Sequence, residues 1–196
     1  MTELVDLAPA AGRMAELAAA VPDDRLDGPT PCPGMPVRAL LSHVLGLSLA
    51  FRLAAEKAPS PGPPPDEPPP LPDDWRPALD KALDELVAAW RAPEAGTGMT
   101  AAGGLDMPAA TAAVVALDEL VLHSWDLARA TGQRYEPDPA DVRLCQGFVE
   151  AAARPEGVLG LFGPPVPVPP DAPPFDRLLG LSGRDPGWQP PGRDRA

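Results

Sequence analysis

The chain contains only two histidines, and one of them lies four residues after a glutamate in the segment DELVLHSWDLARATGQ, residues 118–133. In an α-helix, side chains four residues apart share one face, with their Cβ atoms about 5 to 6 Å apart, so Glu119 and His123 are predicted to point at the same place. The neighbouring residues are largely apolar, and a buried carboxylate without a partner would cost several kcal/mol. A bound metal cation would remove that cost.

The other histidine, His43, lies in a second apolar segment, VRALLSHVLGLSLAFRLAAEK. Two histidines and one carboxylate are a recurrent zinc set, and three protein ligands with a fourth position left to water are typical of a catalytic site. Side chains from facing helices can meet in the core of a bundle. His43, Glu119 and His123 are therefore the candidate metal ligands. Zinc is the expected metal, with nickel as an alternative.

This hypothesis also predicts a pH dependence. Both imidazoles must be neutral to bind a metal, so metal affinity is expected to fall below about pH 6.5, the ordinary pKa of histidine. The alternative interpretation is that Glu119 and His123 form an ordinary pair on a helix without any metal.

Asp126 lies three residues after His123 on the same predicted helix face. It is the candidate catalytic residue, because it can accept a hydrogen bond from the imidazole or act as a base at the open metal position. An ion pair with Arg129 or Arg38 is an equal alternative. Cys32 precedes the second apolar segment, where the positive end of a helix dipole can favour a thiolate, although a structural role is the stronger expectation.

Five helical segments, separated by prolines, are predicted to position these residues. Apolar residues repeat at intervals of three and four over about 2–20, 37–57, 75–90, 108–131 and 139–153. The expected N-caps are Thr2, either Asp73 or Asp74, and Asp138, and Gly132 suits the left-handed residue after a helix end. No segment shows sustained strand alternation.

The remaining segments are rich in proline or glycine. Residues 59–72 hold nine prolines in 14 positions, which predicts an extended surface loop. Residues 96–104 hold four glycines, which predicts a flexible loop. Near the carboxyl end only FDRLLGL, residues 175–181, is expected to form a helical turn. The predicted fold class is therefore all-α, a four-helix bundle over 1–155, with a proline-rich extension over 156–196 that packs on the bundle or trails from it.

Charge and composition narrow the range of partners. Twenty-eight acidic and 16 basic residues give a net charge of -12, which repels nucleic acid, and no basic patch stands out. No membrane span of about 20 apolar residues and no signal peptide is predicted. Cys32 and Cys145 form no CxxC pair and are expected to be reduced. We expect a cytoplasmic protein without a nucleic-acid or membrane partner.

Three blocks of the sequence resemble a known family. They are PTPCPGMPVRALLSHVLG at 29–46, DELVLHSWDLARATGQ at 118–133 and FGPPVPVPPDAPPFDRLLGLSGRDPGW at 162–188. In order and spacing they are similar to an actinobacterial metal-binding family of the DinB/YfiT-like superfamily, which is related to the N-terminal domain of mycothiol-dependent maleylpyruvate isomerase. The resemblance covers nearly the whole chain. Met35 departs from it, since the family usually has a tryptophan there.

The resemblance implies a four-helix bundle with up-down-down-up topology and a divalent metal at one end of its core. The His, Glu, His ligand set of the mycothiol branch matches His43, Glu119 and His123. It also implies mycothiol as a thiol partner, and hence a metal-dependent thiol transferase acting on a small-molecule electrophile. The alternative is a metal-binding or stress-response protein that catalyses nothing. A homodimer through an exposed bundle face is expected, and the isomerase reaction itself is not carried over.

Overall fold

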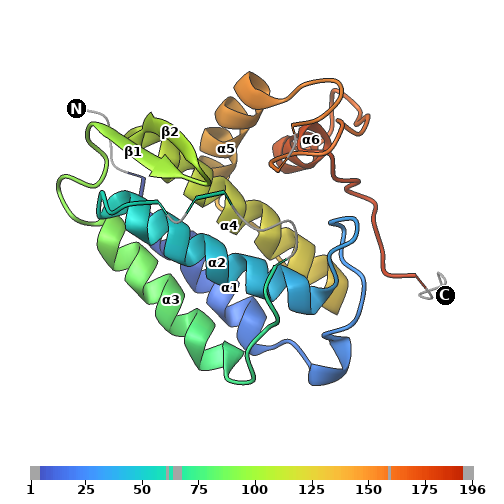
Figure 1. Cartoon of the computed structure of the whole chain (residues 1–196). Coiled ribbons are helices and arrows are strands. Elements are labelled where there is room, and N and C mark those ends of the chain that lie inside the picture. The colour runs from blue at the N-terminus through green and yellow to red at the C-terminus, as the bar shows by residue number, and fades with distance from the viewer. Residues whose placement is uncertain (1–4, 61, 64–67, 159, 192–196) are drawn as a thin grey trace.

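The computed structural model describes residues 5–60, 62–63, 68–158 and 160–191. Within these ranges the chain is mostly helical, as predicted, with six α-helices and one two-stranded hairpin (Figure 1). The elements in chain order are α1 (Ala8–Ala19), α2 (Val37–Ala55), α3 (Trp75–Trp90), β1 (Met99–Ala102), β2 (Leu105–Pro108), α4 (Ala109–Thr131), α5 (Pro139–Ala152) and α6 (Pro174–Leu181). A short 3-10 helix, Asp23–Arg25, follows α1.

Helices α1 to α4 pack against one another in the cyclic order α1, α3, α2, α4. Hydrogen bonds between their ends fix the directions. Lys57 Nζ donates to Ala95 O over 2.7 Å, so α2 and α3 end on the same side. Gln133 Nε2 donates to Leu17 O over 3.0 Å, so α1 and α4 also end together. Figure 1 shows α1 and α4 running opposite to α2 and α3, the up-down-down-up order that the resemblance implies.

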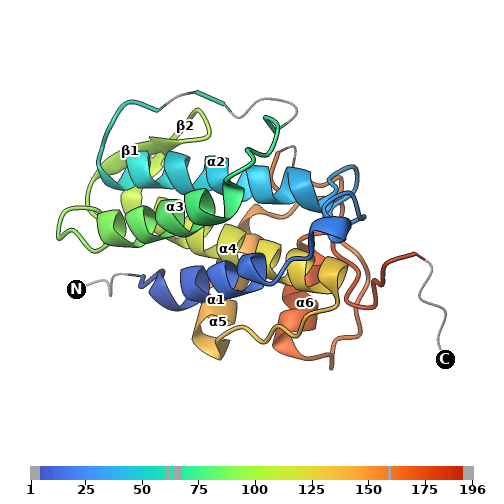
Figure 2. The ribbon, with the colours of Figure 1, turned by 90° about the horizontal axis from the view of Figure 1, so that it is seen from below.

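The proline-rich connection between α2 and α3 follows from this topology. Two parallel helices must be joined by a segment that runs back along their length. Near the end of α2, Pro63 lies against Gly104 of the hairpin. Near the start of α2, the carbonyl of Pro69 accepts a hydrogen bond of 2.6 Å from Ser42 Oγ. The described parts of this connection lie along the outside of α2, as Figure 2 shows, and have no helix or strand.

The core lies around α4, which contacts α1, α2, α5 and the hairpin. Leu40 and Leu41 of α2 and Leu117, Val121 and Leu127 of α4 are fully buried there. Helix α2 is also the one helix among the described residues that is long and apolar enough, by length and composition, to cross a membrane, with a mean hydropathy of 1.4. No such segment is predicted from the sequence. This is a weak indication, because a helix that supplies a bundle core has the same composition.

Helix α1 begins later than predicted, at Ala8 instead of about residue 2. Pro9 explains the difference, because its ring would clash with the carbonyl of Val5 if the helix continued toward the amino terminus. Asp6 Oδ1 accepts a hydrogen bond of 3.0 Å from the Ala8 amide and so closes the helix start. The expected cap, Thr2, lies outside the described residues.

The other predicted helix ends are mostly correct. Asp138 caps α5, since its Oδ1 accepts a hydrogen bond of 2.8 Å from the Ala140 amide. Gly132 ends α4 in the left-handed region, with a φ of 76°. Asp74 occupies the N-cap position of α3, but its side chain makes no capping hydrogen bond.

The expectation of a strand-free chain is wrong at the glycine-rich segment. There β1 and β2 pair antiparallel, with Ala102 opposite Leu105. The two residues between them, Gly103 and Gly104, have φ values of 60° and 80°, and positive φ at both positions is what a tight two-residue hairpin turn requires. Thr100 Oγ1 donates to Ala54 O over 2.6 Å, which ties β1 to the end of α2.

The carboxyl-terminal segment packs on the rest of the molecule through α6, which is longer than the predicted single turn. Leu178 and Leu179 of α6 are fully buried, and α6 contacts α5. The helix ends at Leu181; Gly183, two residues later, has a φ of 84°, and the Arg184 amide donates to Leu179 O over 2.8 Å. A left-handed glycine followed by this hydrogen bond is a Schellman motif, which fixes the backbone direction at Arg184.

Candidate metal centre

The structure brings together all three residues that the sequence selected as metal ligands. His43 comes from α2, and Glu119 and His123 from α4, which packs against α2. Glu119 Oε2 lies 2.9 Å from His123 Nε2 and 3.9 Å from His43 Nε2. The two imidazole rings meet edge to face, with centroids 5.0 Å apart. One donor atom from each residue lies within 4.8 Å of the other two, a separation that a single ion can bridge.

The three side chains differ in their access to solvent. The His43 and Glu119 side chains are 25% and 18% exposed, whereas that of His123 is 7% exposed. The group is therefore buried on the His123 side and open on the other. Beside Glu119, a narrow apolar recess is lined by Val44, Leu47, Phe51, Leu86 and Leu120. Of the three candidate ligands, only Glu119 lines this recess.

Asp126 lies behind the His123 ring. Its Oδ2 is 3.0 Å from His123 Nδ1, and its side chain is fully buried. With Nδ1–H donating to this carboxylate, Nε2 of the neutral ring is left as the acceptor that faces Glu119 and His43. Of the two roles expected for Asp126, the geometry favours the hydrogen-bond acceptor, because its carboxylate lies at the ring nitrogen that faces away from Glu119.

The partner of Asp126 is a residue that the sequence analysis did not consider. Arg184 Nε donates to Oδ1 over 3.0 Å, and Arg184 Nη2 donates to Oδ2 over 2.8 Å. The predicted partners are engaged elsewhere, since Arg38 binds Asp27 and Arg129 donates to the carbonyl of Trp188. Arg184 is 58 residues from Asp126 along the chain, so no helical spacing relates them. Its only signal was its place in the third block that resembles the family.

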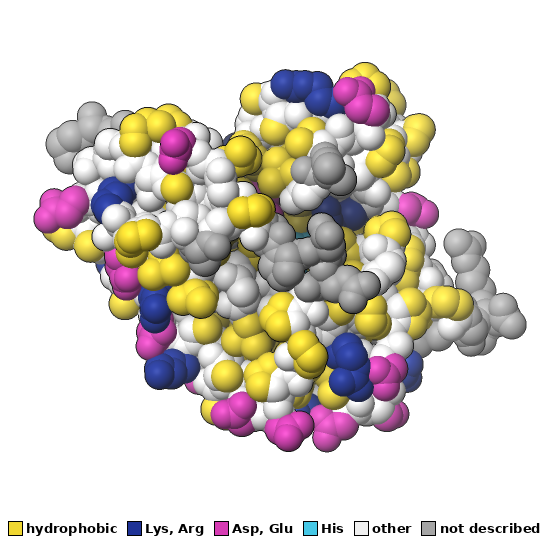
Figure 3. All heavy atoms as spheres, in the orientation of Figure 1, with side chains coloured by type: hydrophobic (Ala, Val, Ile, Leu, Met, Phe, Trp, Pro, Cys, Tyr) yellow, Lys and Arg dark blue, Asp and Glu magenta, His cyan; other side chains and the backbone are white. Residues whose placement is uncertain are grey.

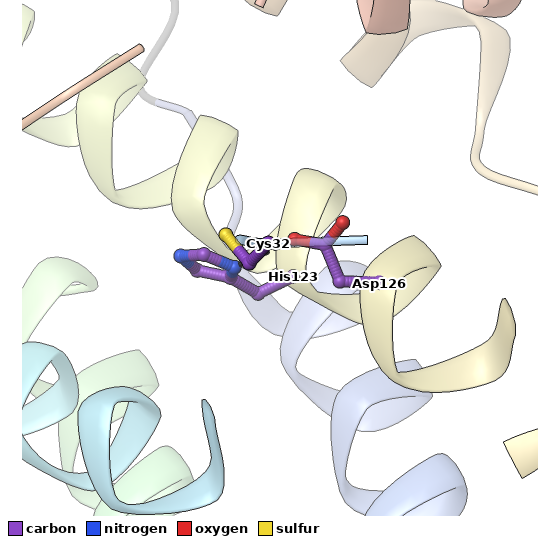
Figure 4. A group of neighbouring side chains, drawn as sticks. All are labelled: Cys32, His123 and Asp126. Atoms are coloured by element: carbon purple, nitrogen blue, oxygen red, sulfur yellow. Dashed lines mark hydrogen bonds and ion pairs between the residues drawn. The ribbon is translucent and has the colours of Figure 1, made fainter. Parts of the chain in front are cut away.

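A second set of donor atoms, from Cys32, His123 and Asp126, also lies within 4.8 Å (Figure 4). Arg184 Nη2 approaches Cys32 Sγ at 3.8 Å while it binds Asp126. A guanidinium already supplies the positive charge at this second set, which disfavours a metal ion there. Burial, followed by the charge of Asp126, raises the pKa of the Cys32 thiol to about 11. The structural interpretation of Cys32 is therefore the better one.

The charges of the centre are strongly coupled. Burial alone would raise the pKa of Glu119, but the neighbouring imidazoles of His123 and His43 hold it well below its usual range. Burial alone would lower the pKa of His123, but hydrogen bonds to Asp126 and Glu119 raise it to about 9. The His123 ring thus lies between two carboxylates, which favour its protonated form. A centre that stabilises a positive charge at this place also fits a divalent ion held by two imidazole nitrogens and a carboxylate oxygen.

The comparisons with known proteins agree with this fold. The family described as mycothiol maleylpyruvate isomerase N-terminal domain matches residues 7–128. Two uncharacterized proteins of Mycobacterium tuberculosis, MT0763 and Rv0738, are each 31% identical to the chain over 175 residues, which are 87% of this chain and 91% of theirs.

Two solved structures share the architecture. They are the crystal structure of the mycothiol-dependent maleylpyruvate isomerase, with a TM-score of 0.60 and 16% identity, and that of a histidine-to-alanine mutant, with 0.61 and 14%. Each alignment covers 74% of this chain and 67% of the other. Taken with the family match over more than half of the sequence, these findings show that the chain belongs to the mycothiol maleylpyruvate isomerase N-terminal domain family.

Proposed function

We propose that the protein is a divalent-metal-dependent enzyme of the cytoplasm that joins a low-molecular-weight thiol, mycothiol, to a small electrophile. One observation carries the proposal: His43, Glu119 and His123 converge from two helices, and the second nitrogen of His123 is engaged by Asp126. The family membership supports mycothiol as the thiol. Zinc is the metal we expect, with nickel as the alternative.

In this proposal His43, Glu119 and His123 hold the ion. A divalent ion at such a site lowers the pKa of a thiol or water in its open position and so supplies a nucleophile at neutral pH. Glu119 brings the negative charge that a divalent ion needs beside two neutral imidazoles. His123 keeps its proton at Nδ1, which donates a hydrogen bond to Asp126. It is the most buried of the three ligands.

The overall reaction is an S-transfer. The thiol gives up its proton, and its sulfur forms a bond to an electrophilic carbon. In a substitution, the leaving group departs with the electron pair of its bond and the thiol proton goes to solvent. In an addition, the electrophile takes up the proton that the thiol gives up, so the product contains all the atoms of both reactants. We expect a panel of alkylating agents and activated alkenes to distinguish these two forms.

Metal content tests the site directly. Elemental analysis of protein titrated with zinc is expected to give about one ion per chain for the natural sequence. His43→Ala removes one of three ligands, and Glu119→Gln removes the negative charge, so both are expected to lose the ion. Glu56→Gln is the matched control, because it neutralises a carboxylate just after α2, next to Arg52 and away from the site. Unchanged zinc uptake in His43→Ala would refute the metal site.

Thiol-dependent activity tests the function. We expect the zinc-loaded protein to consume mycothiol together with an electrophile, and the Glu119→Gln variant to lose this activity. Zinc binding without turnover and without mycothiol binding would instead indicate the alternative, a metal-binding or stress-response protein that catalyses nothing. The homodimer expected from the sequence stays a prediction.

A further inference from the structure

The carboxyl-terminal segment reaches into the candidate metal centre through a single side chain, Arg184. This residue follows α6 and lies outside residues 7–128, the part of the chain that matches the family. It is 7% exposed, and the Asp126 carboxylate that it binds is fully buried. An arginine therefore joins a segment beyond the family match to the centre of α4.

The guanidinium of Arg184 is fully committed to groups of the protein. Nε and Nη2 donate to both oxygens of Asp126, and the bonds to Oδ2 measure 3.2 and 2.8 Å. Nη1 lies 3.4 Å from the carbonyl and the hydroxyl of Ser182, and Nη2 also approaches Cys32 Sγ. Such a forked pair fixes the carboxylate in plane as well as in position. Arg184 is thus suited to orienting Asp126 and has no free donor for a substrate anion.

The backbone that carries Arg184 is held as firmly as its side chain. Gly183 is in the left-handed region, and a Cβ at this residue would lie 2.8 Å from Cα of Gly163. A Cβ at Gly180 would likewise be too close to Val166 and Val168. These close approaches, with the Schellman motif at the end of α6, leave little freedom in where the arginine emerges.

We propose that Arg184 is a positioning residue of the metal centre: it holds Asp126, Asp126 fixes the Nδ1–H of His123, and the Nε2 of His123 is thereby kept toward Glu119 and His43. The geometry is a chain of three buried groups joined by two contacts, from guanidinium to carboxylate and from carboxylate to imidazole. Residues that orient a metal-binding imidazole typically change metal affinity by about 10- to 100-fold when they are removed. This inference rests on the proposed function for its metal, but its geometric part can be tested without one.

Zinc affinity gives the first test, by competition with a chromophoric chelator. We expect Arg184→Gln to bind zinc about 10- to 100-fold more weakly than the natural sequence, and Arg184→Lys to recover part of the loss, because lysine keeps the charge but cannot form the fork. The matched control is Arg129→Gln, which removes the other arginine contact between α4 and this segment, the one to Trp188 O. We expect that variant to stay within about twofold of the natural affinity. An equal loss in both variants would mean that docking of the segment matters and Arg184 does not, and would overturn the proposal.

A double-mutant cycle tests whether Arg184 acts through Asp126. Asp126→Asn alone is expected to weaken zinc binding, and adding Arg184→Gln to it is expected to cause no further loss. Multiplying losses would overturn the proposal. Circular dichroism of each variant shows whether it is folded, and should Arg184→Gln be unfolded, Arg184→Lys and its combination with Asp126→Asn carry the same comparison.

The metal-free protein gives an independent readout. The Nδ1–H of His123, bonded to a buried carboxylate, is expected as a slowly exchanging proton in nitrogen-15 correlation spectra. It is expected to be lost or to exchange rapidly in Arg184→Gln and to persist in Arg129→Gln. A natural chain that binds no zinc would refute the proposed function only, whereas an unchanged Nδ1–H resonance in Arg184→Gln would refute the positioning role.

Discussion

At the scale of single residues, the centre is defined by one imidazole ring between two carboxylates. His123 contacts Glu119 through one nitrogen and Asp126 through the other, at 2.9 and 3.0 Å. Helical spacing predicts both contacts, because these residues lie four and three positions from His123 on one helix. His43 was selected because it was the one remaining histidine, in an apolar segment. Arg184 was not selected, because it is one of 14 arginines and no helical spacing relates it to Asp126, 58 positions away.

The same ring is expected to set the pH dependence of the proposed metal binding. Because hydrogen bonds to Asp126 and Glu119 raise the pKa of His123 to about 9 in the metal-free protein, zinc must displace a proton at every pH below that value. Apparent zinc affinity is therefore expected to fall by about tenfold per pH unit from pH 9 downward. This replaces the expectation of a fall only below about pH 6.5, which assumed an ordinary imidazole.

Chelator competition between pH 6.5 and 9.5 measures this dependence. Calorimetry in two buffers of different ionisation enthalpy should also show about one proton released per zinc at pH 7.5. An affinity that stays constant from pH 7 to 9 would show that His123 titrates like a solvent-exposed histidine.

A third carboxyl of α4, Asp118, is also buried. Burial, followed by the charge of Glu119, raises the pKa of Asp118 to about 8, and its Oδ1 has no hydrogen-bond partner among the described residues. A carboxyl whose pKa is raised on folding makes the protein less stable as the pH rises from the unfolded value toward the folded one. We expect Asp118→Asn to increase the free energy of unfolding by roughly 1–2 kcal/mol at pH 8 and to have little effect near pH 4.

Urea denaturation at the two pH values checks this prediction. Asp106→Asn, at an exposed carboxylate on β2, serves as the control and is expected to change the free energy of unfolding very little at either pH. A gain of equal size at pH 4 and pH 8 would mean that ionisation of Asp118 is not its cause.

At the scale of elements, the helices follow from the apolar periodicity and the prolines, and the deviations have local causes. Pro9 delays α1, and the Gly103–Gly104 pair allows a hairpin where glycine content alone indicated a loop. The short strands escaped prediction because each has only four residues, too few for alternation to stand out. A Gly-Gly turn between two such segments was the signal that identifies them.

Gly183, just after α6, is expected to affect both the stability of the fold and the candidate metal centre. Gly183→Ala is expected to lower the free energy of unfolding by roughly 2–3 kcal/mol, because it combines a left-handed φ with a Cβ 2.8 Å from Gly163. Because it displaces the backbone before Arg184, it is also expected to weaken zinc binding by about tenfold.

Gly160→Ala separates these two causes. Gly160 has a φ of 75°, but a Cβ there meets nothing within 4 Å. In this variant the free energy of unfolding is expected to fall by about 1 kcal/mol, and the zinc affinity is expected to stay unchanged. Thermal denaturation and chelator competition give both quantities, and a normal affinity in Gly183→Ala would show that the Arg184 contact tolerates the shift.

At the scale of the whole molecule, the surface charge limits the kinds of partner that the protein can bind. Figure 3 shows acidic side chains along the lower edge of one face and hydrophobic side chains in its middle. The net charge of -12 makes a polyanionic partner unfavourable. The sequence predicted this surface character from composition alone, because charge needs no knowledge of the fold.

The bundle and the carboxyl-terminal segment are expected to unfold together. Leu178 and Leu179 are fully buried, Arg184 binds Asp126, and Arg129 holds Trp188 O, so the segment shares its core and its ion pair with α4 and α5. Urea curves from circular dichroism and from tryptophan fluorescence should therefore coincide. Hydrogen exchange that releases α6 well before α4 would contradict this expectation.

Arg184 also affects how fragments of such proteins should be chosen. The family match ends at residue 128, so a fragment cut at that boundary would keep all three candidate ligands and lose the cation that neutralises Asp126. In that fragment the uncompensated carboxylate would be free to turn toward water or take up a proton, and the imidazole would lose its orientation. The unit that the family model delimits is therefore smaller than the unit that contains the Arg184–Asp126 ion pair, and a metal-binding constant measured on the shorter piece is expected to be lower than that of the intact chain.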